Sequence, residues 1–232
     1  MNKKHVVVVF SGGLDSTALL MWHLVQRHKV HALSFDYGQR HRRELDSALT
    51  ITTVLRRTYA MTHSIVDLTH VGQFFGGNSQ TDKSIPVPEG HYTDETMKLT
   101  VVPNRNMIML AVATGVAIAE GAGIVSYGAH SGDHAIYPDC RPDFAAAMGI
   151  AIRKGNAPAP RLATPFINMS KSELLCIGSR LGAPFEHTWS CYKSGYEYHC
   201  GKCGTCVERR EAFEHAGVPD PTKYMDKVPV LP

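Results

Sequence analysis

The segment Val6-Val7-Val8-Val9-Phe10-Ser11-Gly12-Gly13-Leu14-Asp15-Ser16-Thr17 decides the fold. Residues 6–10 form a continuous, mostly β-branched apolar run, which is typical of a parallel strand covered on both faces. The polar segment 11–17 leads into apolar residues at helical spacing over 16–27. A buried strand, a glycine-rich turn and a helix in this order indicate an α/β protein with a parallel sheet.

The same alternation continues along the chain. We predict strands over 31–35, 64–66 and 124–128, and helices over 40–57, over 106–120, after Pro142 and from the capping box Ser170–Glu173. The Gly- and Pro-rich segment 69–103 predicts a long functional loop or lid. The fold class is therefore a doubly wound parallel sheet over 1–185, followed by a small appendage over 186–232, where we find little periodicity.

Composition excludes several classes of protein. The 232 residues are 44% hydrophobic, and 24 basic side chains face 21 acidic ones. This balance argues against a nucleic-acid partner. The longest apolar run, 107–119, is shorter than the roughly 20 residues of a membrane span. The N-terminal apolar run is too short for a secretion signal, so we expect a cytoplasmic protein with no membrane partner.

The glycine-rich turn suits a phosphate. Adjacent glycines let backbone amides approach an anion, and a helix N-terminus adds partial positive charge. Ser11, Ser16 and Thr17 add hydroxyl donors, and Asp15 either accepts from a neighbouring amide or helps to hold Mg²⁺. The Walker A lysine is absent. The alternative is a glycine-rich turn before a well-capped helix, with no ligand.

Four cysteines near the C-terminus have the spacing C-x8-C-x2-C-x2-C: Cys191, Cys200, Cys203 and Cys206. Four thiolates on a tight knuckle predict a structural Zn²⁺ site. An iron–sulfur cluster and free thiols are the alternatives, and the proline that follows the last cysteine of bacterial ferredoxins is missing here.

The turn 11–17 resembles the pyrophosphate-binding SGGxDS loop of the PP-loop ATPases. Further segments resemble the 7-cyano-7-deazaguanine synthases, the QueC family: Phe35-Asp36-Tyr37-Gly38-Gln39-Arg40-His41, Pro103-Asn104-Arg105-Asn106, Tyr137-Pro138-Asp139-Cys140-Arg141-Pro142 and the cysteine block. This resemblance implies conversion of 7-carboxy-7-deazaguanine, ammonia and ATP to the nitrile. We expect Mg²⁺ to stabilise the departing pyrophosphate and Zn²⁺ to occupy the cysteine site. The resemblance also implies a homodimer.

Placement within these segments assigns expected roles. The expected ATP-binding residues are Phe10, Ser11, Gly12, Gly13, Leu14, Asp15, Ser16, Thr17, Phe35 and Asp36. The expected catalytic residues are Asp15, Arg105 and Lys171, the last two as cations for phosphate or carboxylate. The expected substrate-binding residues are Tyr37, Arg40, His130, Asp133, Tyr137, Asp139 and Arg141.

One departure from the family pattern leaves alternatives open. The strand exit from Gly128 to Ile136 differs from the shorter lead found in much of the family. The chain could therefore stop at the amide or pass the activated acyl group to another amine. It could also be another PP-loop ligase, or a nucleotide-sensing module without turnover.

Overall fold

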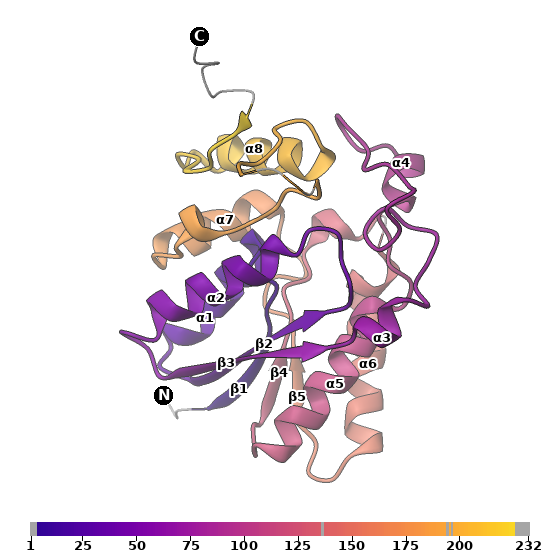
Figure 1. The fold of residues 1–232 in the computed structure, drawn as a ribbon. Helices are drawn as coiled ribbons and strands as arrows, with labels where there is room; N and C mark the ends of the chain where they lie inside the picture. Colours follow the sequence, from indigo (N-terminus) through magenta and orange to yellow (C-terminus); the bar gives the residue numbers. More distant parts are fainter. Residues whose placement is uncertain (1–3, 136, 194, 196, 226–232) are drawn as a thin grey trace.

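The computed structural model describes residues 4–135, 137–193, 195 and 197–225, so Ile136 lies outside the described part. A five-stranded parallel sheet with the order β3-β2-β1-β4-β5 forms the centre of the molecule (Figure 1). The strands are β1 (His5–Val9), β2 (Lys29–Asp36), β3 (Met61–Asp67), β4 (Ile124–Ser126) and β5 (Arg161–Ala163). The predicted parallel α/β sheet is confirmed.

Helices cover both faces of the sheet, and β1 shows why. Val6 and Val8 belong to one core cluster, and Val7 belongs to the other, because successive side chains of a strand point to opposite faces. On the first face lie α1 (Leu14–Leu24), α2 (Arg43–Leu55) and α7 (Lys171–Arg180). On the second face lie α5 (Arg105–Ala119) and α6 (Pro142–Gly155) (Figure 1).

The structure adds elements that the sequence analysis missed. Strand β5 is only three residues long, too short for a visible alternation. The long loop contains the short helices α3 (Thr69–Gly72) and α4 (Asp94–Lys98). The last segment contains helix α8 (Gly204–Ala216), which buries Ala212 and Phe213 in the core cluster of α1 and α7. The sequence shows little periodicity here because α8 is mostly polar and buries few apolar residues.

Three 3₁₀ turns complete the described elements: η1 (Ser131–Asp133), η2 (Pro138–Cys140) and η3 (Phe185–His187). In the part of the chain that the structure describes, no helix is both long and apolar enough to cross a membrane.

Two neutral histidines connect the helices to the sheet. His23 on α1 lies 3.0 Å through Nε2 from the Ser126 hydroxyl on β4. His63 on β3 lies 2.8 Å through Nε2 from the Ser34 hydroxyl on β2, and 3.2 Å through Nδ1 from the Thr52 hydroxyl on α2. Burial lowers the pKa of both imidazoles to about 4. The fold therefore holds them uncharged.

These histidines predict a loss of stability in mild acid. In the unfolded chain a histidine gains a proton near pH 6.5, whereas in the folded protein these histidines gain it near pH 4. The stabilisation present above pH 6.5 is therefore lost as the pH falls toward 4. We expect His23 to contribute about 1–2 kcal/mol of this loss between pH 7 and pH 5. Urea unfolding at both pH values should show a smaller loss for His23→Gln than for the wild type. The exposed His215→Asn is the control, and an unchanged loss in His23→Gln would contradict the assignment.

Candidate functional site

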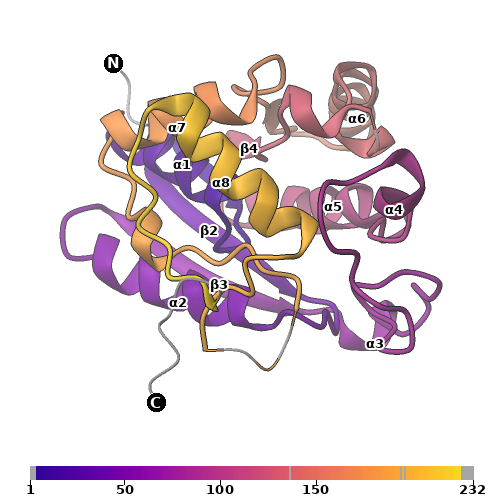
Figure 2. The same cartoon turned by 90° about the horizontal axis from the view of Figure 1, so that it is seen from above.

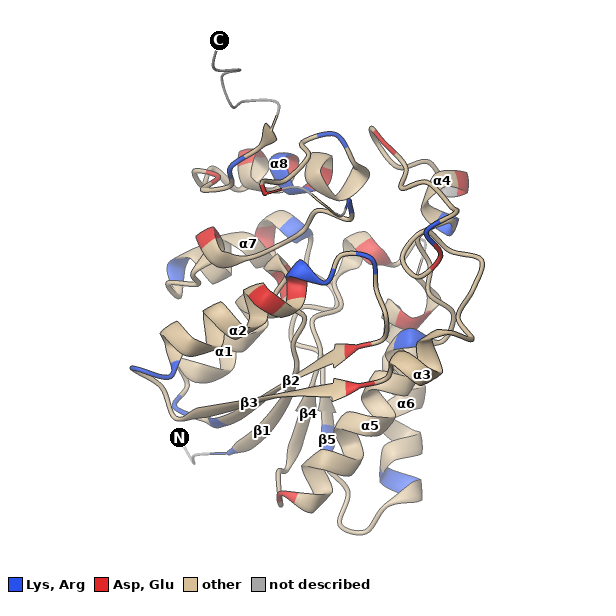
Figure 3. Cartoon of the chain, in the orientation of Figure 1, with Lys and Arg blue, Asp and Glu red and all other residues tan. Residues whose placement is uncertain are grey.

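A cavity of about 230 Å³ opens at the carboxyl ends of β1, β2 and β4. Strand β1 lies between β2 and β4, so the chain connections run in opposite directions from this point. Open α/β sheets bind ligands at such a switch point. Figure 2 looks onto this end of the molecule, with α8 lying across it. Charged residues of both signs surround the same end (Figure 3).

The turn after β1 is stabilised by its own hydroxyl groups. The Gly13 amide donates to Ser11 Oγ at 3.1 Å, and the Ser11 amide lies 3.3 Å from Ser16 Oγ. The hydroxyls of Ser16 and Thr17 donate to the Gly13 carbonyl at 3.2 and 2.7 Å. The predicted hydroxyl groups therefore shape the turn as well as line the cavity.

Gly12 allows this turn to pack against α2. Its φ is +83°, a backbone angle that residues with a side chain rarely adopt. A Cβ at this position would lie 2.4 Å from the Glu44 carbonyl oxygen and 2.6 Å from the Ala48 amide nitrogen. Backbone atoms at those distances cannot move aside without shifting the helix. A Cβ on Gly13, by contrast, would meet Ser11 Oγ at 3.2 Å.

We therefore expect Gly12→Ala to lower the free energy of unfolding by about 2 kcal/mol or more, because strain at φ and a backbone clash act together. The matched variant Gly13→Ala has a permissive φ of −78° and should lose far less. Denaturant unfolding of both variants checks this. Equal losses would show that the contact between Gly12 and α2 is not the constraint.

An ion-pair chain lies beside the turn. Lys171 Nζ lies 3.8 Å from Asp15 Oδ2 and 3.6 Å from Glu208 Oε2. His130 Nε2 lies 3.7 Å from the same Asp15 oxygen and 3.5 Å from Asp133 Oδ2. Lys171 begins α7, where Ser170 and Glu173 form the predicted capping box. The lysine is thus fixed over the turn.

These contacts shift the pKa values in opposite directions. Burial by itself raises the pKa of Asp15, but Lys171 and His130 outweigh it and lower that pKa well below its ordinary value. Burial lowers the pKa of Lys171, but Asp15 and Glu208 outweigh it and raise that pKa above its ordinary value. Burial raises the pKa of Asp133. At neutral pH the site therefore holds a fixed ammonium group and a fixed carboxylate side by side.

The opposite wall of the cavity is aromatic with one guanidinium. Arg105 starts α5, and its Nη1 lies 3.4 Å from the Tyr37 hydroxyl. The Tyr137 hydroxyl lies 2.8 Å from the Thr100 hydroxyl. A flat ring system can stack among these side chains, and Arg105 can receive a phosphate or carboxylate oxygen.

Most of the predicted site residues line the cavity. These are Phe10, Ser11, Gly13, Leu14, Asp15, Ser16, Phe35, Tyr37, Arg105, Asp133, Tyr137 and Lys171. Gly12 and Thr17 support the turn from behind, and His130 lies between Asp15 and Asp133.

Four other predicted residues have partners within the protein. Asp36 pairs with Arg42 at 2.6 Å, and Arg40 donates to the carbonyls of Asp82 and Ile85 at 2.7 and 3.0 Å. Asp139 accepts from the Asn106 amide at 3.1 Å, at the start of α5. Arg141 Nε donates to the His134 carbonyl at 2.7 Å. The structure thus shows these four shaping the loops around the cavity, and their contact with ligands stays a prediction.

Sequence reasoning missed several lining residues. They come from the start of α2, from the long loop and from the C-terminal segment: His41, Glu44, Tyr92, Trp189, Ser190, Tyr192, Thr205 and Glu208. His41 lies in the Phe35–His41 motif but was given no role there. No local pattern marked the others, because each reaches the cavity only through the path of its own segment across the sheet edge.

Residues 87–92, here called the strap, run from the long loop along the C-terminal segment. The Gly90 amide donates to the Lys202 carbonyl at 2.8 Å, and Glu89 pairs with Lys193. The Tyr92 ring packs on Gly204, where a Cβ would meet ring atoms at 2.3–2.5 Å. The strap therefore depends on the C-terminal segment for its position beside the cavity.

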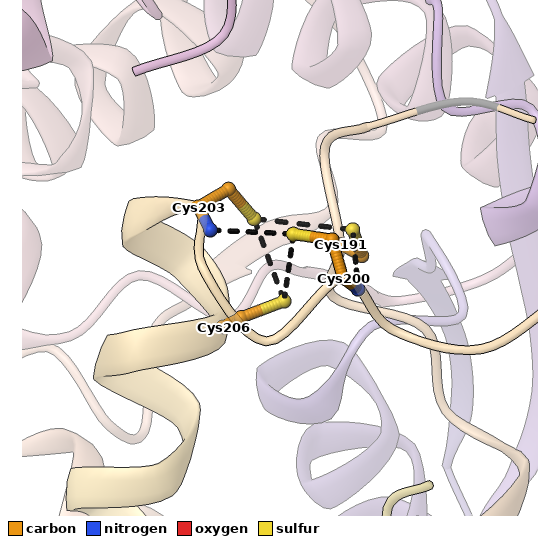
Figure 4. A group of neighbouring side chains, drawn as sticks. All are labelled: Cys191, Cys200, Cys203 and Cys206. Atoms are coloured by element: carbon orange, nitrogen blue, oxygen red, sulfur yellow. Dashed lines mark hydrogen bonds between the residues drawn. The ribbon is translucent and has the colours of Figure 1, made fainter. Parts of the chain in front are cut away.

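The four predicted cysteine ligands converge at one buried point (Figure 4). Their sulfurs lie within 4.8 Å of one another. The Cys203 sulfur lies 3.4 Å from that of Cys206 and 3.9 Å from that of Cys191. Four sulfurs at about 2.3 Å from a tetrahedral ion would be about 3.8 Å apart. The donor set and its spacing therefore fit a bound metal ion.

Backbone amides point at the same sulfurs. Those of Cys203 and Lys202 donate to the Cys200 sulfur at 3.2 and 3.4 Å, and that of Cys200 donates to the Cys191 sulfur at 3.4 Å. Such bonds favour thiolates, which are the forms that bind a metal.

The fold and the site together define a nucleotide-binding α/β protein of the PP-loop type: the SGGLDS turn lies at the switch point of a parallel sheet, with Lys171 and Arg105 in the same cavity. Among solved structures, a 4-thiouridine synthetase in complex with RNA and ATP has a similar fold, with a TM-score of 0.51 and 16% identity over 96% of this chain and 48% of that one.

The family model of the queuosine biosynthesis protein QueC matches residues 5–217. The chain is 52% identical over 224 residues to a 7-cyano-7-deazaguanine synthase of Brucella anthropi, covering 95% of this chain and 93% of the relative. It is 50% identical over 219 residues to one of Marinobacter nauticus, covering 94% and 96%. The chain belongs to the QueC family, as the sequence motifs indicated.

Proposed function

We propose that this protein converts 7-carboxy-7-deazaguanine and ammonia to 7-cyano-7-deazaguanine in two ATP-dependent steps. One observation carries the proposal: the nucleotide-type turn and an aromatic wall line the same cavity. An acid bound against that wall has its carboxylate next to the phosphates of a nucleotide on the turn. The names of relatives that match nearly the whole chain support the same substrate.

In the first step the substrate carboxylate attacks the α-phosphorus of ATP. A carboxylate–phosphorus bond forms, and the bond from that phosphorus to the pyrophosphate oxygen breaks. The amides of the turn, Lys171 and Arg105 stabilise the charge that develops on the phosphate oxygens. Because Lys171 is already held between Asp15 and Glu208, it needs little reorganisation.

Ammonia then replaces AMP at the acyl carbon, and the resulting amide is adenylated through its oxygen by a second ATP. Loss of AMP and a proton from this second adenylate leaves the nitrile. The same turn and cations serve both adenylations. The carboxylate oxygen in the first and the amide oxygen in the second belong to the same ring substituent, so both meet the α-phosphate at the same place.

The metals follow from the donor sets. We propose Zn²⁺ at Cys191, Cys200, Cys203 and Cys206, where four thiolates leave no open position and the role is structural. We propose Mg²⁺ as the partner of the ATP phosphates, where it neutralises their charge. Asp15 already faces Lys171 and His130, so its carboxylate is engaged by side chains of the protein. A homodimer and a cytoplasmic location remain expectations from the family resemblance and from the sequence.

The experiment for the reaction counts AMP against product by mass spectrometry, with 7-carboxy-7-deazaguanine, ammonium and Mg-ATP. We expect two AMP for each nitrile. One AMP with accumulating amide would support the amide-forming alternative, and no AMP would overturn the substrate.

Lys171→Ala should lower turnover about 100-fold or more, because it removes a positioned cation. Lys154→Ala, on an exposed turn of α6, is the matched control.

For the metal, we expect one zinc ion per chain by elemental analysis, and Cys206→Ser should lose it. Without the ion the C-terminal segment loses much of its folding free energy, and the strap loses its support at Gly204. Limited proteolysis should then cut the strap faster than in the wild type. The control variant Ser84→Ala changes an exposed serine and leaves all the cysteines in place. It should keep both the zinc and the resistance of the strap to proteolysis. Retained protection after zinc loss would contradict the structural role.

A further inference from the structure

We propose that Asp133 is the proton acceptor for the incoming amine, so that this cavity contains a site that binds ammonium and converts it to ammonia. This inference rests on the proposed function. Ammonium is the predominant form at neutral pH and has no lone pair, so it must lose a proton before it attacks the acyl adenylate. The cavity therefore needs a base beside the acyl carbon.

Asp133 has the required position. It lines the cavity from η1: its side chain faces His130, which also faces Asp15 of the turn, and its carbonyl accepts from the Tyr137 amide at 2.9 Å. Lys171 and Arg105, to which the proposed function assigns the phosphates and the substrate acid, line the same cavity. A nucleophile held by Asp133 is thus near the place where the carboxylate and the α-phosphate meet.

His130 faces one oxygen of this carboxylate and leaves the other available. His130 Nδ1 accepts from the Gly132 amide at 3.1 Å, so the ring proton is on Nε2. The His130 side chain is 3% exposed, and its Nε2 makes no hydrogen bond but lies 3.5 Å from Asp133 Oδ2. Among the described residues, no hydrogen bond engages Asp133 Oδ1.

The other carboxylates of the cavity are less suited. Asp15 faces both Lys171 and His130, and its pKa is lowered. Glu208 pairs with Lys171, and Glu44 pairs with His41 at 3.2 Å. Each of these carboxylates has an ion-pair partner within 4 Å, Lys171 or His41, that does not lie within 4 Å of Asp133.

The surroundings of Asp133 favour proton uptake. Burial raises the pKa of Asp133, and the charge of Asp15 raises it further. His130 and Lys171 lower this pKa but do not outweigh the increase. For His130, burial lowers the pKa but Asp15 and Asp133 raise it by more, so Nε2 stays protonated. The charged and titratable groups that face Asp133 are His130, Lys171, Asp15, Arg105, Tyr127, Tyr137 and Cys140.

The balanced step is as follows. Asp133 takes one proton from bound ammonium, and the freed lone pair forms a C–N bond at the acyl carbon. The carbon–oxygen bond to AMP breaks, and AMP leaves with that electron pair. The amine nitrogen then loses a second proton to water, which leaves the neutral amide.

The experiment compares two nucleophiles on Asp133→Asn. Hydroxylamine is unprotonated at neutral pH and gives the hydroxamate, so it needs no base to become a nucleophile. We expect Asp133→Asn to lower the rate with ammonium about 100-fold. Its rate with hydroxylamine should fall by a factor at least ten times smaller. Because both rates come from one preparation, the fraction of folded protein cancels in their ratio. Asp143→Asn, on the exposed start of α6, is the matched control and should keep the wild-type ratio.

The pH profile gives a second readout. The ammonium rate of Asp133→Asn should recover relative to the wild type as the pH rises toward the alkaline range, because free ammonia then becomes abundant. Equal losses with both nucleophiles, or no recovery at high pH, would overturn the role of Asp133. Failure of the wild type itself to form AMP with the deazapurine acid would instead overturn the proposed function.

Discussion

The contact between Gly12 and helix α2 is the constraint on which the site depends. The turn after β1 can face a phosphate only if its backbone passes close to the α2 backbone, and the absence of a Cβ at Gly12 permits that approach. The hydroxyls of Ser11, Ser16 and Thr17 then hold the turn in one shape. A preformed set of amides stabilises developing charge without reorganising during the reaction.

The ion-pair chain from Glu208 through Lys171 to Asp15 joins parts of the chain that are far apart in sequence. Glu208 belongs to α8, the helix that starts next to the cysteine cluster. A metal ion bound at the cysteines would therefore be linked to the nucleotide site through α8, and to the cavity through the strap that packs on Gly204. The C-terminal segment is part of the site as well as a support for it.

Within the cavity, similar side chains take different roles because their partners differ. Asp15 and Asp133 both face His130, yet only Asp15 also has Lys171 within 4 Å. The pKa of Asp15 is lowered and that of Asp133 is raised. Opposite shifts on neighbouring carboxyl groups separate a fixed negative charge from a group that can take up a proton.

The sequence by itself determined the parallel α/β class, the nucleotide-type turn, the four clustered cysteines and the family. Each of these is encoded over a short distance: an apolar strand before Gly12 and Gly13, or cysteines a few residues apart. Only the tertiary structure decided that Tyr92 and Glu208 reach the cavity, and that Asp36, Arg40, Asp139 and Arg141 hold loops around it. Those outcomes depend on how distant segments cross the carboxyl edge of the sheet. Such crossings are set by long-range packing, which leaves no periodic signal in the local sequence.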